Sequence, residues 1–166
     1  MNEAIVREGL PHPPSSVHEL AVVTDAFSSL IRLRGIGFRL IVVTNQPDIA
    51  RGKISRETVE RINAYLLSNL PIDDVEVCPH DDADACDCRK PLAGMLLRAA
   101  QRHRLELGHS FMVGDRWRDI EAGRRAGCRT VLIDNGYREA IRSKPDAAVV
   151  SLTDAANYII AMSKQQ

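Results

Sequence analysis

The sequence predicts an α/β fold in which a parallel sheet carries helices on both faces. Strand-like and helix-like segments alternate along the chain, as they do in folds of this class. The segment FRLIVVT at 38–44 is a largely apolar, β-branched run, which is typical of a strand buried on both faces. Polar residues stand at the carboxyl ends of two strand-like segments, where parallel sheets bind their ligands.

The first half of the chain is expected to hold two helices and two strands. Residues 1–20 contain three prolines and little periodicity, so we expect an extended loop there. A helix over 22–34 should end near Gly35 and Gly37, and the strand at 38–44 follows. Ser55 is a suitable N-cap for a helix that runs to about Leu70, and DVEVC at 74–78 is a short strand.

The second half continues the alternation. A helix is expected at 92–104, followed by the strand SFMVGD at 110–115, which ends in a carboxylate. DIEAGRRAG at 119–127 is expected to form a helix that stops at Gly127, and RTVLID at 129–134 is the next strand. A loop, a short strand at 147–150 and a helix at 153–162 complete the pattern.

Length and charge narrow the class of protein. A chain of 166 residues fits one domain, 1–166, and buries roughly 70% of the surface that it exposes when unfolded. The 22 Lys and Arg residues balance the 22 Asp and Glu residues, so no net charge attracts nucleic acid or an anionic membrane. The sequence shows no apolar run of ~18 residues and no signal peptide. We expect a cytoplasmic protein, in which clustered cysteines favour metal over disulfides.

The segment CPHDDADACDCRKP at 78–91 has the composition of a metal site. Its two pairs, Cys78-x-His80 and Cys86-x-Cys88, supply the four soft or borderline ligands that structural zinc prefers. A solvated acidic loop, a calcium loop and a redox pair are the alternatives. The aspartate spacing lacks the glycine turn and distal glutamate of an EF-hand, and redox pairs are more often C-x-x-C than C-x-C. The spacing therefore favours zinc.

Two groups of polar residues suit a phosphate ligand. Thr44, Asn45 and Gln46 end the first strand with a hydroxyl, two amides and backbone N–H groups, although an ordinary strand-to-loop turn has the same composition. Arg89 and Lys90 directly follow the metal-like loop. Arginine can clamp phosphate as a bidentate fork and lysine as a point charge, and a solvated basic turn is the alternative.

A third group follows the strand at 110–115. Asp115 ends that strand, and Asp119 lies one helical turn further. A carboxylate there suits Mg²⁺, which takes one or two carboxylates plus phosphate oxygens; the alternative is that either residue caps the next helix. Arg116, together with Trp117 and Arg118, is a candidate substrate contact or a cover for the start of that helix.

Three motifs in this order resemble the haloacid-dehalogenase (HAD) superfamily. They are TNQ after a buried strand, C-x-H-x5-C-x-C-R-K-P, and V-G-D-x-x-x-D-I-E-A-G. The closest branch is similar to the heptose 1,7-bisphosphate and histidinol-phosphate phosphatases. The resemblance covers nearly the whole chain and implies a Rossmann-like sheet, a zinc-stabilised loop and no large cap domain.

The resemblance also implies a reaction and a set of roles. In the family, a phosphomonoester is hydrolysed through an aspartyl-phosphate with the help of Mg²⁺, and the substrate here would be a small phosphorylated sugar or related metabolite. By motif match, Thr44 and Lys90 would hold the transferring phosphoryl group, and Asp115 would bind Mg²⁺. The residues that would contact phosphate or sugar are Asn45, Gln46, Arg89 and Arg116. The ligands of the structural zinc would be Cys78, His80, Cys86 and Cys88.

The chain departs from the family pattern at two places. Pro47 stands where the heptose enzymes have serine, which bears on substrate identity. The first motif of the family, a strand ending in D-x-D-G, is not in the sequence, so we expect it upstream of Met1 and expect the 166 residues alone to be inactive. A zinc-stabilised protein that binds a phosphate ligand without catalysis is the alternative. A zinc module for protein or nucleic-acid contact is disfavoured by neutral charge and by the lack of an aromatic platform.

Overall fold

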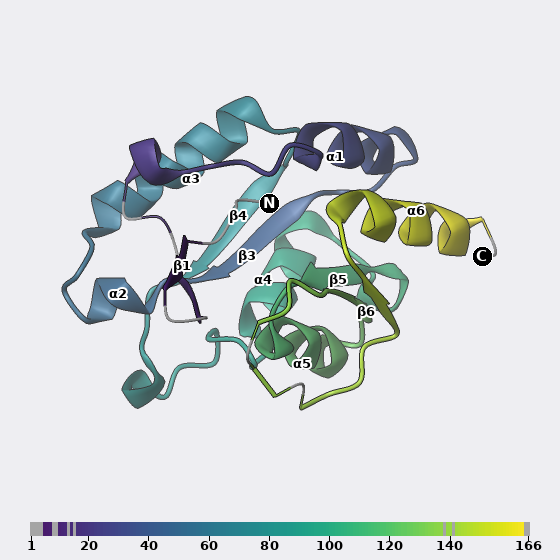
Figure 1. The fold of residues 1–166 in the computed structure, drawn as a ribbon. Helices are drawn as coiled ribbons and strands as arrows, with labels where there is room; N and C mark the ends of the chain where they lie inside the picture. Colours follow the sequence, from purple (N-terminus) through teal and green to yellow (C-terminus); the bar gives the residue numbers. More distant parts are fainter. Residues whose placement is uncertain are drawn as a thin grey trace.

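The computed structural model describes residues 5–7, 10–12, 14, 16–137, 139–140 and 142–164. Its parallel strands form a middle layer with helices on both sides, as the sequence predicts (Figure 1). The helices on one side are α1 (Ala26–Gly35), α3 (Arg56–Asn69) and α6 (Leu152–Ser163), and those on the other are α4 (Gly94–His103) and α5 (Trp117–Ala126). The short helix α2 spans Pro47–Ala50, and 3-10 turns span Val17–Glu19, Asp82–Asp84 and Leu107–His109.

The parallel strands fall into two groups. One pairs β3 (Ile41–Asn45) with β4 (Asp74–Cys78), and the other pairs β5 (Phe111–Gly114), β6 (Arg129–Ile133) and β7 (Ala147–Val149) in that order. Within the described part of the chain, no backbone ladder joins β3 to β5.

A short antiparallel hairpin precedes these strands. It consists of β1 (Ile5–Arg7) and β2 (Leu10–His12), so the prediction of an extended loop is wrong for these residues. Part of that predicted loop, at 1–4, 8–9, 13 and 15, lies outside the described residues.

β3 and β5 each have one edge that no described strand covers. The Leu40 carbonyl accepts a hydrogen bond from the Asp73 N–H at 2.7 Å. Because backbone groups alternate along a strand, the odd-numbered residues of β3 turn theirs away from β4. The Ser110 carbonyl likewise accepts from the Arg129 N–H at 3.0 Å, so the backbone groups of 111 and 113 face away from β6.

This free edge changes the burial of β3. All of its residues are only partly buried, although Val42 packs against the cluster of α1 and α3 and Val43 packs on the opposite face against Leu96 and Met112, so both faces are covered as predicted and the accessibility comes from the edge. A strand with a neighbour on one side stays accessible along the other. β6 has neighbours on both sides, and its Thr130, Val131 and Leu132 are buried.

Local signals in the sequence set several boundaries. The Ser55 hydroxyl accepts from the Thr58 N–H at 3.1 Å and caps α3, as predicted. Gly127 ends α5 with φ of 81°, a left-handed conformation that glycine adopts without strain. α1 begins four residues later than predicted, because Val22 and Val23 pack against the core ahead of the helix.

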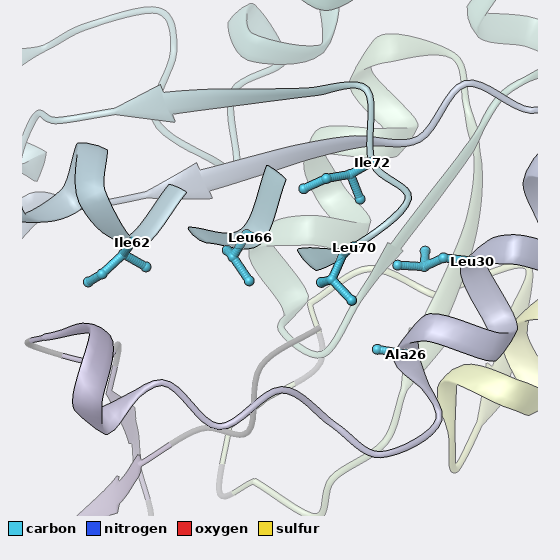
Figure 2. Packing of buried hydrophobic residues seen from close by; sticks show 6 residues of the cluster. All are labelled: Ala26, Leu30, Ile62, Leu66, Leu70 and Ile72. Carbon is cyan, nitrogen blue, oxygen red and sulfur yellow. The ribbon is translucent and has the colours of Figure 1, made fainter. Parts of the chain in front are cut away.

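The largest group of buried side chains joins α1, α3 and the approach to β4. Figure 2 shows its six members pointing into one space between these segments. They are Ala26, Leu30, Ile62, Leu66, Leu70 and Ile72. A second cluster lies between α6 and β6 and includes Val131, Ala155, Ala156 and Ile159. Each group of strands thus has its own apolar support, and the candidate site lies where the two groups meet.

Candidate active site and metal centre

The candidate residues gather at the carboxyl ends of the parallel strands. Thr44 and Asn45 are the last residues of β3, Cys78 is the last of β4, and Asp115 directly follows β5. The loop between β4 and α4 carries Lys90 back to the end of β3 and to the first turn of α5.

The four predicted zinc ligands come together. Cys78, His80, Cys86 and Cys88 place one ligand atom each within 4.8 Å of one another, and no other group of metal-ligand residues does so in the part of the chain that is described. The sulfur of Cys78 lies 3.7 Å from that of Cys86 and 3.8 Å from Nδ1 of His80, and the Cys88 sulfur lies closer to all three, at 3.0–3.4 Å. Ligands of tetrahedral zinc lie about 3.5–3.8 Å from one another. The donor set fits one Zn²⁺, and a small outward shift of the Cys88 sulfur would bring the spacing to the tetrahedral value.

The environment of this cluster shifts the pKa values of Cys78 and Cys86 in opposite directions. Burial raises the pKa of Cys78 to about 12, and the neighbouring Cys88 thiol adds to the rise. Burial also opposes ionisation of Cys86, but hydrogen bonds from the backbone N–H groups of Arg89 and Cys88 outweigh it and lower its pKa to about 7. Zinc binds cysteine as the thiolate, so the charge of a bound zinc ion would stabilise the Cys78 thiolate that burial disfavours.

Arginines hold the loop that carries the cluster. Nε and Nη2 of Arg51 each donate to Asp81 at 2.7 Å. Nε of Arg89 donates to Asp82 at 2.7 Å, and Nη1 of Arg118 lies 3.6 Å from the same carboxylate. Arg89 is therefore engaged by a carboxylate of its own loop in this conformation.

Lys90 is the buried cation of the site. Its ammonium lies 2.6 Å from a carboxylate oxygen of Asp119 and donates to the Val43 carbonyl at 2.7 Å. The Asn45 side chain holds the Lys90 backbone from both sides, since its amide donates to the Lys90 carbonyl and its oxygen accepts from the Lys90 N–H, each at 3.0 Å. Asn45 thus positions Lys90.

Asp119 is buried and serves two partners. One carboxylate oxygen pairs with Lys90, and the other accepts from the Arg116 N–H at 3.2 Å at the start of α5. Gly114 makes room for it, because a Cβ at position 114 would lie 2.3 Å from the Cβ of Asp119. Of the two alternatives for Asp119, this geometry fits the cap.

Thr44 and Gln46 lie together at the end of β3. The Gln46 amide donates to the Thr44 hydroxyl at 3.3 Å, and the Gln46 N–H donates to the Cys78 carbonyl at 2.8 Å. The hydroxyl and the strand end are thereby held beside the metal-like cluster.

Arg116 forms an ion pair with Glu139 through two guanidinium nitrogens. This hydrogen bonding raises the pKa of Arg116. The guanidinium groups of Arg118 and Arg142 lie 4.9 and 4.6 Å from the centre of the Trp117 ring. The arginines that follow Asp115 are thus held by a carboxylate or by the indole.

A hollow adjoins Asp115 at the ends of β5 and β6. Its lining consists of Asp115, Trp117, Leu132, Asp134, Asn135, Tyr137 and Glu139. The Asn135 amide donates to Asp115 at 3.4 Å and to the Tyr137 hydroxyl at 3.2 Å. Burial, and then the charge of Asp115, raises the pKa of Tyr137.

Sequence reasoning did not identify Asp134, Asn135 and Tyr137. The signal was present, because these residues follow the strand predicted at 129–134 just as Thr44 and Asp115 follow theirs. Glu139 has no such signal, since its partner Arg116 lies 23 residues away in the chain.

Comparison with known proteins agrees with this geometry. Residues 87–155 match the family model described as HAD-hydrolase-like. The chain is 31% identical over 162 residues to the D-glycero-beta-D-manno-heptose-1,7-bisphosphate 7-phosphatase of Vibrio cholerae, an alignment that covers 89% of this chain and 87% of the relative. It is 32% identical over 165 residues to the protein of the same name from Escherichia coli K12, with 90% and 86% covered.

Solved structures share the fold. The D,D-heptose 1,7-bisphosphate phosphatase from B. bronchiseptica, complexed with magnesium and phosphate, aligns with a TM-score of 0.76 and 26% identity over 89% of this chain and 88% of that one. A HAD-like phosphatase from Mesorhizobium loti aligns with a TM-score of 0.75 and 28% identity over 90% and 78%.

Among the described residues, no helix is long and apolar enough to cross a bilayer.

The helix-flanked parallel strands, the motifs at their carboxyl ends and relatives that match across most of both chains lead to one conclusion. The chain belongs to the HAD family of phosphatases.

Proposed function

We propose that this protein is a phosphomonoester hydrolase that acts on a small phosphorylated sugar of the heptose bisphosphate class, or on a related metabolite. The observation that carries the proposal is the Lys90 ammonium, buried where β3, the metal-like loop and α5 meet. An ammonium has three N–H donors, and Asp119 and Val43 take two, which leaves one for a phosphate oxygen. Phosphoryl transfer depends on such positioned charge. The activity named for the relatives supports the heptose class.

Two metal ions belong to this proposal. Asp115, partly buried at a strand end and held by Asn135, is the carboxylate that would bind Mg²⁺ together with phosphate oxygens. When bound, Mg²⁺ would neutralise charge on the phosphoryl group. Cys78, His80, Cys86 and Cys88 would hold a structural zinc ion that keeps residues 89–90 in place.

The remaining polar residues have distinct proposed roles. Thr44 would donate its hydroxyl to the phosphoryl group, and Gln46 would orient that hydroxyl. Asn45 would act through the Lys90 backbone. Arg89 and Arg116 would contact substrate only after exchanging their present carboxylate partners. Balanced charge supports a small metabolite in the cytoplasm as the partner, with neither nucleic acid nor a membrane.

We expect the 166 residues alone to bind phosphate without turnover. They contain no D-x-D-G motif, which in the family supplies the nucleophile and the acid/base. The edges of β3 and β5 that no described strand covers support this expectation, because a strand carrying that motif would pair between them.

Phosphate release from D-glycero-β-D-manno-heptose 1,7-bisphosphate with Mg²⁺ tests the proposal. It is measured for the 166-residue chain and for a version extended by the in-frame upstream codons. We expect turnover only from the extended version, and phosphate binding, measured by calorimetry, from both. Turnover by the 166-residue chain would contradict the expectation that these residues lack the nucleophile. Phosphate binding without turnover in both versions would favour the alternative, a non-catalytic zinc-stabilised binding protein.

A further inference from the structure

We propose that Arg98, on α4, supports the metal centre from outside its four ligands. It donates to the sulfur of Cys88, and its charge offsets the negative charge that zinc-bound thiolates leave on the site. This inference rests on the zinc site of the proposed function. It adds a residue that lies beyond the ligand motif, since Arg98 belongs to the helix that follows the loop at 78–91.

The register of α4 against β4 brings Arg98 to the cluster. Alternate residues of a strand share one face, so Glu76 and Cys78 of β4 lie on the same face. On the helix, residues three or four positions apart share one face, which aligns Met95, Arg98 and Arg102. Met95 packs against the buried cysteines of the cluster, and Arg102 lies 2.6 Å from Glu76. Arg98 therefore lies between the cluster and the Glu76 carboxylate.

Three acceptors contact the Arg98 guanidinium. Nη1 donates to the Asp87 carboxylate at 3.4 Å, and Nε lies 3.7 Å from a carboxylate oxygen of Glu76. The third acceptor is the Cys88 sulfur, to which Arg98 hydrogen-bonds. Burial opposes ionisation of Arg98, but the Cys88 sulfur and the two carboxylates outweigh it and raise the pKa of Arg98. The guanidinium thus stays charged beside the sulfur.

The start of α4 is fixed to the loop that carries the ligands. The Gly94 N–H donates to the Asp87 carbonyl at 3.1 Å, and a Cβ at position 94 would lie 2.5 Å from that oxygen. The helix can approach the loop this closely because glycine has no side chain. Arg98 lies one turn further along α4 and Cys88 directly follows Asp87, so this contact sets the distance between them.

The ligand set accounts for the need of a cation. Zinc binds cysteine as the thiolate, so three thiolates and a neutral histidine around Zn²⁺ leave one net negative charge. Two of the cysteines are buried, where an uncompensated charge is costly. Arg89 and Lys90 adjoin the cluster in the chain, but each is paired with a carboxylate. Arg98 differs because one of its three acceptors is the cluster itself.

The carboxylates around Arg98 leave much of its charge for the cluster. Glu76 has Arg102 as a second partner, and the Asp87 side chain is largely exposed, so water screens its charge. The Arg98 side chain is itself 39% exposed and is screened in part. We therefore expect an effect at the lower end of the about 10- to 100-fold range in metal affinity that such supporting residues contribute.

Zinc affinity, measured at neutral pH by competition with a chromophoric chelator, tests the inference. Arg98→Met should weaken zinc binding about tenfold. Arg98→Lys, which keeps the charge but not the planar fork, should lose less. Arg102→Met is the matched control, because it removes the same charge one turn further along α4 and also removes a contact to Glu76. It should change zinc affinity by less than about twofold, since solvent screens a charge that does not contact the cluster.

Cobalt in place of zinc separates the charge of the site from the shape of its loop. The d–d bands of Co²⁺ report tetrahedral coordination, and the thiolate-to-cobalt charge-transfer band reports the energy of the sulfur lone pairs. A cationic donor stabilises those lone pairs, so Arg98→Met should move the charge-transfer band to longer wavelength and leave the d–d bands unchanged. Arg102→Met should move neither.

Equal zinc affinity of Arg98→Met and the parent, or an unshifted charge-transfer band, would overturn this inference alone and leave the zinc site in place. Loss of the tetrahedral d–d bands in Arg98→Met would also overturn it, because Arg98 would then shape the loop rather than offset its charge. An equal loss of affinity in Arg102→Met would overturn it as well, since any cation of α4 would then serve. A parent protein that binds no zinc would overturn the zinc site and this inference together, whereas the turnover assay tests the hydrolase separately.

Discussion

The buried ion pair between Lys90 and Asp119 makes a quantitative prediction. The two side chains are 11% and 8% exposed, and their charged atoms lie 2.6 Å apart. Lys90→Met leaves the Asp119 carboxylate with the hydrogen bond that it accepts from the Arg116 N–H at 3.2 Å. Removing one member of a buried pair costs about 3–5 kcal/mol, and the retained hydrogen bond offsets about 1 kcal/mol. We therefore expect the free energy of unfolding to fall by about 2–4 kcal/mol.

A double-mutant cycle isolates the pair itself. Asp119→Asn leaves the ammonium buried against the Val43 carbonyl and should cost a similar amount. The double variant Lys90→Met/Asp119→Asn buries no charge at either position, so its loss should be smaller than the sum of the single losses by about 2 kcal/mol.

Urea unfolding of zinc-loaded protein, followed by Trp117 fluorescence, measures these free energies. The exposed pair of Arg61 and Glu57 on α3 is the matched control, with charged atoms 3.7 Å apart and side chains 64% and 79% exposed. Its cycle should give a coupling below about 0.5 kcal/mol. If the loss in the double variant equals the sum of the two single losses to within about 0.5 kcal/mol, Lys90 and Asp119 do not stabilise each other and our reasoning is wrong.

Three further predictions address the metal, pH and anion binding. Elemental analysis should find about one zinc ion per chain, and chelation or Cys86→Ser should lower the urea midpoint; reduced, folded protein without zinc would contradict the site. Asp146→Asn should lower the unfolding free energy at pH 7 by about 1–2 kcal/mol, because the carboxylate accepts from the Thr130 N–H and hydroxyl at 2.7 and 2.8 Å. Those hydrogen bonds lower the pKa of Asp146 in the folded state, so the stability that its carboxylate contributes is fully present above pH ~4 and is lost as the pH falls through that pKa. If the parent and Asp146→Asn still differ as much in unfolding free energy at pH ~2 as at pH 7, this prediction is wrong. Asp82→Asn should tighten inorganic phosphate binding about threefold by calorimetry, since it removes the shortest of the contacts that hold Arg89, whereas Asp87→Asn in the same loop should not. Equal affinities of the two variants would count against Arg89 as a phosphate contact.

The parts of the fold that local sequence determines could be predicted. The cap at Ser55 and the stop at Gly127 depend on a few neighbouring residues, and both boundaries follow from them. The apolar run at 38–44 predicts that both faces of β3 are packed, but the accessible edge of β3 depends on which strands lie beside it, and a single segment does not encode that. The proline content of residues 1–20 predicted a loop, but a hairpin forms there, in which Pro11 of β2 pairs with Val6 of β1.

The candidate site likewise has a part that local sequence predicts and a part that depends on tertiary structure. The candidate zinc ligands lie within eleven positions, 78–88, so their spacing alone indicates that they meet. The partners of Arg116 and Lys90, at Glu139 and Asp119, are brought near by tertiary structure and follow from no short motif. Paired charges such as these are consistent with a chain without net charge, because Lys90 and Arg116 are each matched by a carboxylate.

Lys90 also links the metal to the pairing of the two strand groups. It follows Cys88 by two positions, its backbone pairs with Asn45, and its ammonium reaches both Val43 in β3 and Asp119 in α5. Since no described strand joins β3 to β5, this tie depends on where the loop holds Lys90. Removing zinc frees that loop, so the coupling in the Lys90–Asp119 cycle should fall by about half or more in chelated protein. An unchanged coupling without metal, together with its loss in zinc-loaded Asn45→Ala, would show that the amide pair, and not zinc, positions Lys90.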